Sequence, residues 1–148
     1  MVNYFLSTVR YEKTMENGLN KIVSEQYLFD ALSFTEAEAR TIEELKRYIS
    51  GEFSIPTIVK PRISELFLSE DVSADRFYKV KVSFITLDEK TGAEKKTAQF
   101  ILVQASDFKN AYDRFIEGMK GSMADYEIVS IVETPILDYY PVKYDKDE

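Results

Sequence analysis

Residues 27–40, YLFDALSFTEAEAR, pass from a strand pattern into the start of a helix, and residues 101–114, ILVQASDFKNAYDR, repeat that passage 74 positions later. The same offset, without a gap, gives further identities along the chain: Tyr4/Tyr78, Gly18/Gly92, Lys21/Lys95, Ile42/Ile116, Glu43/Glu117, Lys46/Lys120 and Pro61/Pro135. Self-similarity at one fixed offset is the signature of an internal repeat. We therefore interpret the chain as a tandem duplication of one small unit.

Each copy begins with the pattern of a β-hairpin and ends with a further extended segment. Branched and aromatic side chains predict the strands, and Asn17-Gly18 and Thr91-Gly92 are turn signals between the first two strands of each copy. The predicted strands cover residues 3–11, 21–32 and 52–67 in the first copy and 77–87, 97–105 and 126–140 in the second. Within 77–87, apolar and polar side chains alternate, which is typical of a strand with one buried face.

A helix follows the hairpin in each copy. Ser33 and Asp107 are both good N-cap residues and stand 74 positions apart. We expect the first helix to run to about residue 49 with Gly51 as its stop, and the second to end at Gly118 or Gly121.

The unit is thus β-β-α-β, used twice, which predicts an α+β fold. We expect an antiparallel sheet of about six strands, with both helices on one face and a pseudo-two-fold axis between the copies. The chain of 148 residues suits a single domain made of two repeats, residues 3–68 and 76–141, followed by a polar tail at 142–148.

Composition excludes several classes of function. The chain contains no cysteine and no histidine, so it has no disulfide, no thiolate zinc site, no cysteine nucleophile and no histidine base. Gly18 and Gly92 belong to no phosphate-binding motif. We predict no catalytic residues, no metal site, no cofactor and no enzymatic activity.

Net charge and hydropathy indicate whether the chain binds nucleic acid or crosses a membrane. The net charge of −7 speaks against a general nucleic-acid coat protein, although it is compatible with a local basic face. No apolar run is long enough to cross a membrane, and the first residues lack the pattern of a signal peptide. We expect a cytoplasmic protein.

Several strings point to a family. VRYEKTMENG, DALSFTEAEAR, VSFITLDEKTGAEKKTA and EGMKGSMADYEIVSIVETPI resemble a family of unknown function, about 150 residues long, that occurs in gut-anaerobe bacteria and their phages. The resemblance covers nearly the whole chain. It implies a setting of phage or mobile elements and carries no activity, substrate or site residue.

One candidate binding site lies on the second hairpin. Its residues are basic and aromatic side chains that we expect to line a groove for nucleic acid: Arg76, Lys79, Lys81, Lys95, Lys96 and Tyr78. Lysines would meet phosphates while rings stack on bases. The alternative is that these lysines are ordinary solvent-facing strand residues, which discourage strands from pairing at a sheet edge.

Two other clusters have alternative interpretations. The aromatic segment around Asp138, Tyr139, Tyr140 and Tyr144 is either a stacking or docking strip or core packing at the end of a strand. The first helix carries four carboxylates that are either Mg²⁺ ligands or a helix cap and a solvated helix face: Glu36, Glu38, Glu43 and Glu44.

Two functions remain. The first is a non-catalytic binding module of a phage or mobile element, with single-stranded nucleic acid as the first candidate ligand. The alternative is a protein–protein interaction factor that modulates a host or phage complex, because an acidic surface suits a basic partner. We also expect a homo-oligomer, joined through sheet faces or sheet edges, with the proline-bearing segments 55–67 and 128–140 as the candidate edges.

Overall fold

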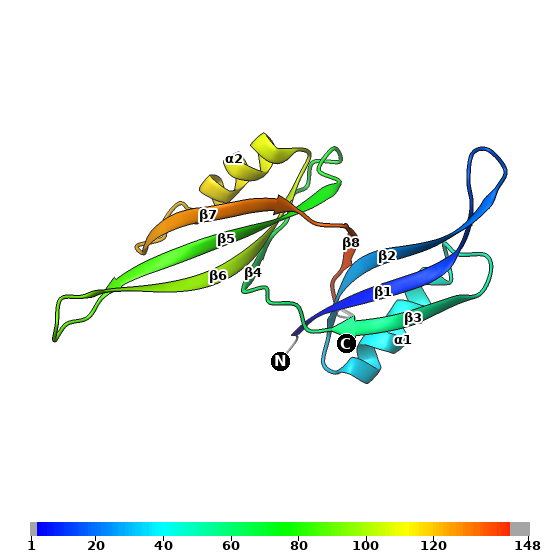
Figure 1. Cartoon of the computed structure of the whole chain (residues 1–148), viewed down its shortest axis with the longest axis horizontal. Helices are drawn as coiled ribbons and strands as arrows, with labels where there is room; N and C mark the ends of the chain where they lie inside the picture. Colours follow the sequence, from blue (N-terminus) through cyan, green and yellow to red (C-terminus); the bar gives the residue numbers. More distant parts are fainter. Residues whose placement is uncertain (1–2, 143–148) are drawn as a thin grey trace, which may run out of the picture. The chain divides into compact units, whose positions relative to one another are not determined.

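The computed structural model describes residues 3–142 (Figure 1). The first repeat contains β1 (Asn3–Thr14), β2 (Asn20–Ala31), α1 (Phe34–Leu45), β3 (Phe53–Val59) and β4 (Glu65–Phe67). The second contains β5 (Arg76–Leu87), β6 (Glu94–Ala105), α2 (Phe108–Met119), β7 (Asp125–Glu133) and β8 (Ile136–Tyr140). Each repeat therefore has the predicted β-β-α-β order and a short fourth strand after it. Of the predicted polar tail, residues 143–148 lie outside the described residues.

The strands of residues 3–142 form two four-stranded sheets, in the orders β3-β1-β2-β8 and β4-β6-β5-β7. The α+β class is confirmed, whereas the expectation of one sheet of about six strands was wrong. Both sheets are mixed, because β8 runs parallel to β2 and β4 runs parallel to β6, while the other neighbours are antiparallel.

The fourth strand of each sheet comes from the other repeat. One compact unit consists of the described parts of Met1–Pro61 and Pro135–Glu148, and the second unit is Arg62–Thr134. The strand β8 ends the second repeat but completes the first unit, and β4 ends the first repeat but completes the second unit. The extended segments predicted at the end of each repeat are thus divided between two sheets.

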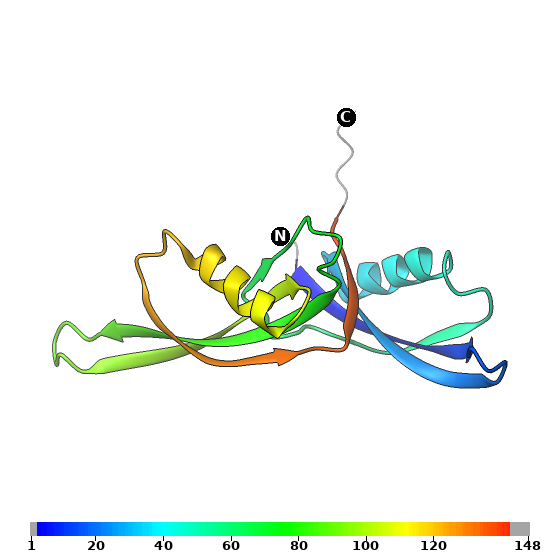
Figure 2. The ribbon, with the colours of Figure 1, turned by 90° about the horizontal axis from the view of Figure 1, so that it is seen from above.

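Each helix covers one face of its own sheet (Figure 2). Both N-caps are confirmed: Ser33 Oγ accepts the backbone N–H of Glu36 at 3.1 Å, and Asp107 Oδ1 accepts that of Asn110 at 2.8 Å. These bonds satisfy amides that have no partner within the helix. The buried core of the first unit is Phe5, Val9, Tyr27, Phe29, Ala31, Ala37, Leu45 and Ile49. That of the second is Tyr78, Val80, Val82, Ile101, Val103, Ala105, Ala111, Phe115 and Met119.

The helix ends differ in part from the prediction. The helix α1 ends at Leu45, and Gly51 is not in the left-handed conformation, so its assignment as a helix stop was wrong. A turn over residues 46–48 already bonds back to the last helical carbonyls. In the second unit Gly121 adopts φ 87° just after the helix, as a C-terminal glycine does, while Gly118 lies inside α2.

The two hairpins differ by one residue. Thr14 pairs with Asn20 at the end of the first hairpin, and Leu87 pairs with Glu94 at the end of the second, so the second loop is one residue longer. The strands β2 and β6 correspond at an offset of 74, but β1 and β5 correspond at 73. The gapless alignment of Tyr4 with Tyr78 was therefore wrong, because Tyr78 occupies the position of Phe5.

Candidate functional site

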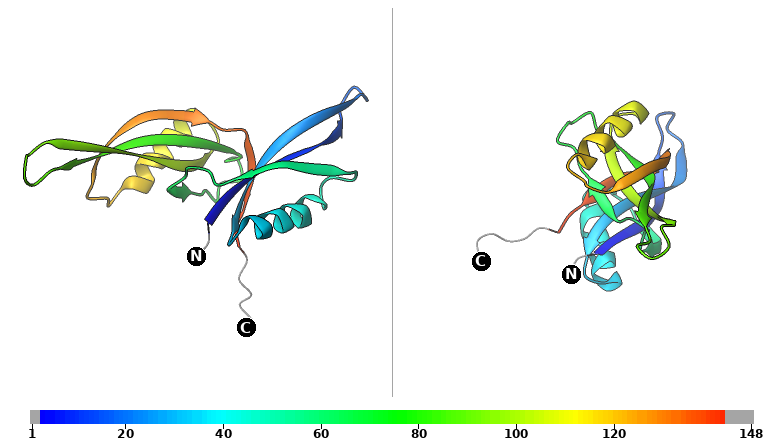
Figure 3. Two further views of the ribbon diagram at one scale, coloured as in Figure 1. Left: turned by 60° about the horizontal axis from the view of Figure 1, so that its bottom comes forward. Right: turned by 90° about the vertical axis from the view of Figure 1, so that its left-hand side faces the viewer.

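Successive side chains of β5 lie on opposite faces of the second sheet, with Arg76 on the face beneath α2 and Phe77 on the same face as Lys79 and Lys81. Val80 and Val82 are fully buried beneath α2 with Phe115. Lys79 and Lys81 are half-buried on the opposite face, since successive side chains of a strand point to opposite sides. The predicted alternation of this strand is confirmed. The β5–β6 hairpin continues beyond the end of α2 (Figure 3).

Phe100 of β6 lies on the same face as the two lysines. It faces Lys81 directly across the strand pair. The ammonium nitrogen of Lys79 lies 4.9 Å from the centre of the Phe100 ring, and the guanidinium carbon of Arg62 lies 4.9 Å from the same centre. We call Arg62, Lys79, Lys81 and Phe100 the basic–aromatic cluster.

Backbone structure holds this cluster in place. Phe100 and Lys81 belong to the long hairpin, whose register is continuous from Arg76 to Leu87. Arg62 precedes β4, and the backbone N–H of Ser64 donates to the Phe100 carbonyl at 2.7 Å, which ties the Arg62 segment to β6. A cation over an aromatic ring contributes about 0.5–1 kcal/mol at an exposed site. Two cations therefore lie over one half-buried ring, and Lys81 faces that ring across the strand pair.

The arrangement suits an anionic ligand that carries flat rings. Guanidinium and ammonium groups bind phosphates, and a base can stack on the Phe100 ring when Arg62 or Lys79 moves from the ring to a phosphate.

The structure brings only some of the predicted residues together. Lys79 and Lys81 lie in the cluster. Lys96 is on the same face, opposite Ile85, but its ammonium group is 3.5 Å from a carboxylate oxygen of Glu127, which offsets its charge.

The other predicted residues belong to the opposite face. Tyr78 is 3% exposed and packs with Ala105 and Ala111. A hydrogen bond with Tyr78 and the nearby charge of Glu133 raise the pKa of Arg76 above its ordinary value. Lys95 pairs with Thr86 and also has the opposite orientation to Lys81.

Sequence reasoning missed Phe100 and Arg62. Phe100 could have been found by counting the hairpin register back from the turn, which places it opposite Lys81. Arg62 carries no such signal, because its position depends on β4 joining the second sheet rather than the first.

The aromatic segment near the C-terminus forms part of the first core. The ring of Tyr140 stacks on that of Phe29, with centres 4.9 Å apart, and the Tyr139 hydroxyl donates to Asp30 Oδ2 at 2.6 Å. Burial raises the pKa of Tyr140 to about 12. Core packing at a strand end is thus confirmed for Tyr140, whereas Tyr139 lies on the opposite face of the sheet beside Leu28, and Tyr144 lies outside the described residues.

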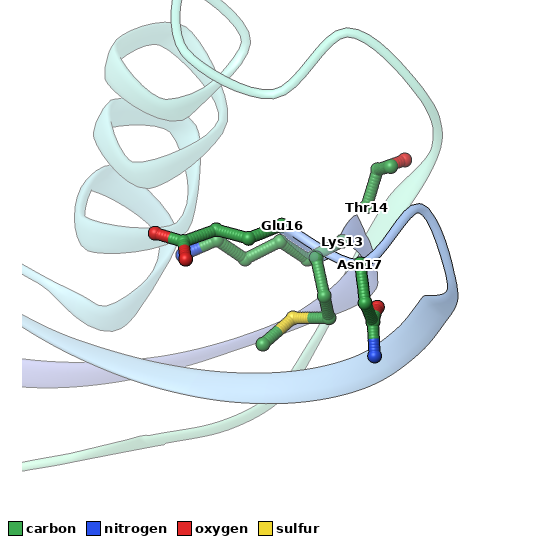
Figure 4. Close-up of a pocket in the computed structure, with 5 residues that line it drawn as sticks. Lys13, Thr14, Glu16 and Asn17 are labelled. Carbon is green, nitrogen blue, oxygen red and sulfur yellow. The ribbon is translucent and has the colours of Figure 1, made fainter.

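Three further features concern metal binding, membrane crossing and a surface pocket. Among residues 3–142, no three acidic side chains are grouped so that they could hold a metal ion. Within the same residues, no helix is long and apolar enough to cross a membrane. An open pocket of about 490 Å³ lies at the turn of the first hairpin, where Lys13 and Glu16 extend in the same direction (Figure 4).

No curated protein matches the chain. Residues 3–142 match the family described as a domain of unknown function, DUF4494, which covers nearly all of the sequence. The chain therefore belongs to the DUF4494 family.

Proposed function

We propose that this chain is a non-catalytic binding module that holds single-stranded nucleic acid on the basic–aromatic cluster. The observation that carries the proposal is the half-buried Phe100 ring, contacted by Arg62 and Lys79 and faced by Lys81. The resemblance of the sequence to proteins of gut bacteria and their phages supports a phage or mobile-element setting, and we place the activity in the cytoplasm.

A single strand fits this surface better than a duplex. The bases of a single strand are free to stack on a protein ring, whereas those of a duplex are stacked on each other. Lys79 and Lys81 are two residues apart on one strand, so their Cα atoms are about 6.7 Å apart, and both can follow one extended backbone. The contacts involve rings and charges only, so the preference among base sequences should be small.

The net charge limits the affinity. With 19 basic and 26 acidic side chains, the chain as a whole repels a polyanion. Attraction must come from the few cations of the cluster, so binding should be moderate and should weaken as salt is added.

The test is fluorescence anisotropy with a labelled single-stranded oligonucleotide and the matching duplex. Wild type should bind the single strand saturably and more tightly than the duplex. Lys79→Glu/Lys81→Glu should reduce the affinity at least tenfold, because two attractive charges become repulsive.

A matched control variant distinguishes the effect of the cluster's own charges from the effect of the net charge of the chain. Lys109→Glu/Lys120→Glu makes the same change of net charge at two exposed positions, one in α2 and one at its C-cap, and should change the affinity less than threefold. Equal losses in the two double variants, with folded circular dichroism spectra, would remove the cluster from the account. A flat titration of wild type would reject nucleic acid as the ligand.

A protein partner is the second candidate, favoured by the tip of the first hairpin. Leu19 and Ile22 are 67% and 61% exposed there, and Met15, which lines the pocket of the same hairpin turn, is 38% exposed. Exposed apolar side chains that form a contiguous patch are typical of protein docking sites, and these three residues all belong to the end of one hairpin. If the oligonucleotide titration is flat, capture of host proteins by wild type but not by Leu19→Asp/Ile22→Asp would support this function.

A further inference from the structure

The first unit holds its fourth strand through a small set of local contacts. The strand β8 runs parallel to β2, with Leu28 facing Tyr139 and Phe29 facing Tyr140. The Tyr140 ring stacks on Phe29, and the carboxylate of Asp30 accepts the Tyr139 hydroxyl at 2.6 Å. The first unit thus binds β8 through its backbone and through the rings of Tyr139 and Tyr140.

An arginine fixes the end of the same segment. Arg40 Nη2 donates to the carbonyl of Pro141 at 2.9 Å, and its other terminal nitrogen donates to the carbonyl of Asp30. The guanidinium also lies 5.7 Å from the centre of the Phe29 ring. One side chain thus joins β2 to the residue that follows β8.

In the second unit an equivalent arginine binds the residue that follows β4. Arg114, which is 74 positions after Arg40, donates from Nη2 to the carbonyl of Leu68 at 3.1 Å, just after β4. The ring of Phe67 packs near Phe115, with centres 6.1 Å apart. The two units therefore share three contacts with the incoming segment, namely a parallel backbone pairing, a packed ring and an arginine bond to the carbonyl that follows the strand.

A short connection links β8 to β7, and its first residue is hydrogen-bonded to the second unit. Only Thr134 and Pro135 separate β7 from β8. The backbone N–H and the hydroxyl of Thr134 both donate to the carbonyl of Phe77 at 2.8 Å, and proline restricts the backbone after it. Short, restricted connections favour exchange of an element between chains, because each chain then closes on a neighbour with the same contacts.

We infer that the strand site beside β2 also accepts β8 from a second copy of this chain, and that two chains form a closed dimer by exchanging β8. The contacts inside each completed sheet are the same in the monomer and in the dimer. The balance between them therefore depends on concentration, since a short connection gives the strand of the same chain an effective concentration on the order of millimolar.

Disulfide trapping in the full-length chain tests the exchange, because the natural sequence has no cysteine. Tyr27 and Asp138 face each other across β2 and β8. The variants Tyr27→Cys and Asp138→Cys are made as separate chains with different tags, mixed, refolded together at about 10 µM and at about 1 mM, and oxidised. Neither chain alone can form the 27–138 bond.

The inference predicts a disulfide-linked heterodimer that carries both tags. Its ratio to monomer should rise in proportion to the free monomer concentration, by at most about 100-fold between the two concentrations. Tyr27→Cys mixed with Lys109→Cys, on the exposed face of α2, should give no comparable product. Within one chain, Tyr27→Cys/Asp138→Cys should close an internal bond at the low concentration, which checks the geometry.

Three results would overturn the inference. The first is an internal bond in the double variant with no heterodimer in the mixture at either concentration, and the second is a control mixture that cross-links equally. The third needs no cysteine: wild type that is strictly monomeric by light scattering after refolding at about 1 mM leaves no exchanged dimer.

Discussion

At the scale of single residues, the first hairpin strand and the helix of each unit pack through equivalent positions, but the side chains are polar in the first unit and apolar in the second. In the first unit the hydroxyls of Ser7 and Thr41 are fully buried and lie 2.8 Å apart between β1 and α1. In the second unit the corresponding positions, at offsets of 73 and 74, are the apolar pair Val80 and Phe115. A buried polar group is tolerated only while it has a partner, so the hydroxyl pair is stable as a pair.

The Ser7–Thr41 pair should therefore show coupling in a double-mutant cycle. Thr41 Oγ1 also donates to the carbonyl of Ala37 at 2.7 Å, so its one proton is used and Ser7 is the donor between the two hydroxyls. Thr41→Val should cost about 1–3 kcal/mol by leaving Ser7 buried without an acceptor. Ser7→Ala should cost about 1 kcal/mol, and the double variant clearly less than the sum. Urea unfolding measures all three, and additive losses would contradict the pairing.

Tyr140 should make stability fall at high pH. Burial, followed by the nearby charges of Asp138 and Glu44, raises its pKa to about 12 in the folded chain, against an ordinary value near 10. Between about pH 10 and 12 the unfolded chain loses this proton while the folded chain keeps it, so the free energy of unfolding is unaffected below pH 10 and declines above it. Urea unfolding at about pH 8, 10 and 11 measures the decline, which should be smaller in Tyr140→Phe. An identical decline in that variant would show that Tyr140 is not responsible.

At the scale of elements, α2 makes an unusually close contact with the strand that completes its sheet. A Cβ atom on Gly118 would lie 2.5 Å from Cε2 of Phe67 in β4. The glycine allows the helix to approach a ring that also packs near Phe115. The absence of a side chain at this position is thus part of how the second unit accepts β4.

Gly118→Ala should consequently lower stability although alanine is the better helix former. Alanine gains about 1 kcal/mol in a helix interior, but forcing a ring out of a packed position costs about 1–3 kcal/mol. The melting temperature should fall, and Phe67→Leu in the same chain should recover part of the loss. Gly51→Ala is the control, since a Cβ there meets nothing within 4 Å and the backbone is not left-handed, and it should be neutral or stabilising. A stabilised Gly118→Ala chain would contradict the close contact.

Local signals in the sequence predicted the elements well. Ser33 and Asp107 fixed both helix starts, because a cap depends on neighbouring amides alone. The alternation from Tyr78 to Phe84 identified the buried face of β5. The exchange of β4 and β8 was missed, because strand propensity says nothing about which sheet a short segment joins. The position of Arg62 beside Phe100 depends on that exchange and was missed with it.

At the scale of the whole molecule, duplication has not produced two equal surfaces. The extra residue in the second hairpin loop gives β1 and β5 an offset of 73, so Lys79 and Lys81 occupy the positions of Leu6 and Thr8. Phe100 likewise occupies the position of Gln26. The basic–aromatic cluster therefore has no counterpart at these positions of the first unit, and the proposed binding activity belongs to the second.

The salt dependence of single-strand binding tests the proposed function most directly. For a single strand, the slope of log affinity against log salt is about −0.7 for each phosphate neutralised, so three cations predict a slope of roughly −2. Lys81→Gln should reduce the magnitude of the slope by about 0.7. Phe100→Leu should weaken binding by about 1–3 kcal/mol and leave the slope unchanged, since stacking releases no counterions. A slope that Lys81→Gln does not alter, or an affinity that Phe100→Leu does not alter, would contradict binding at this cluster.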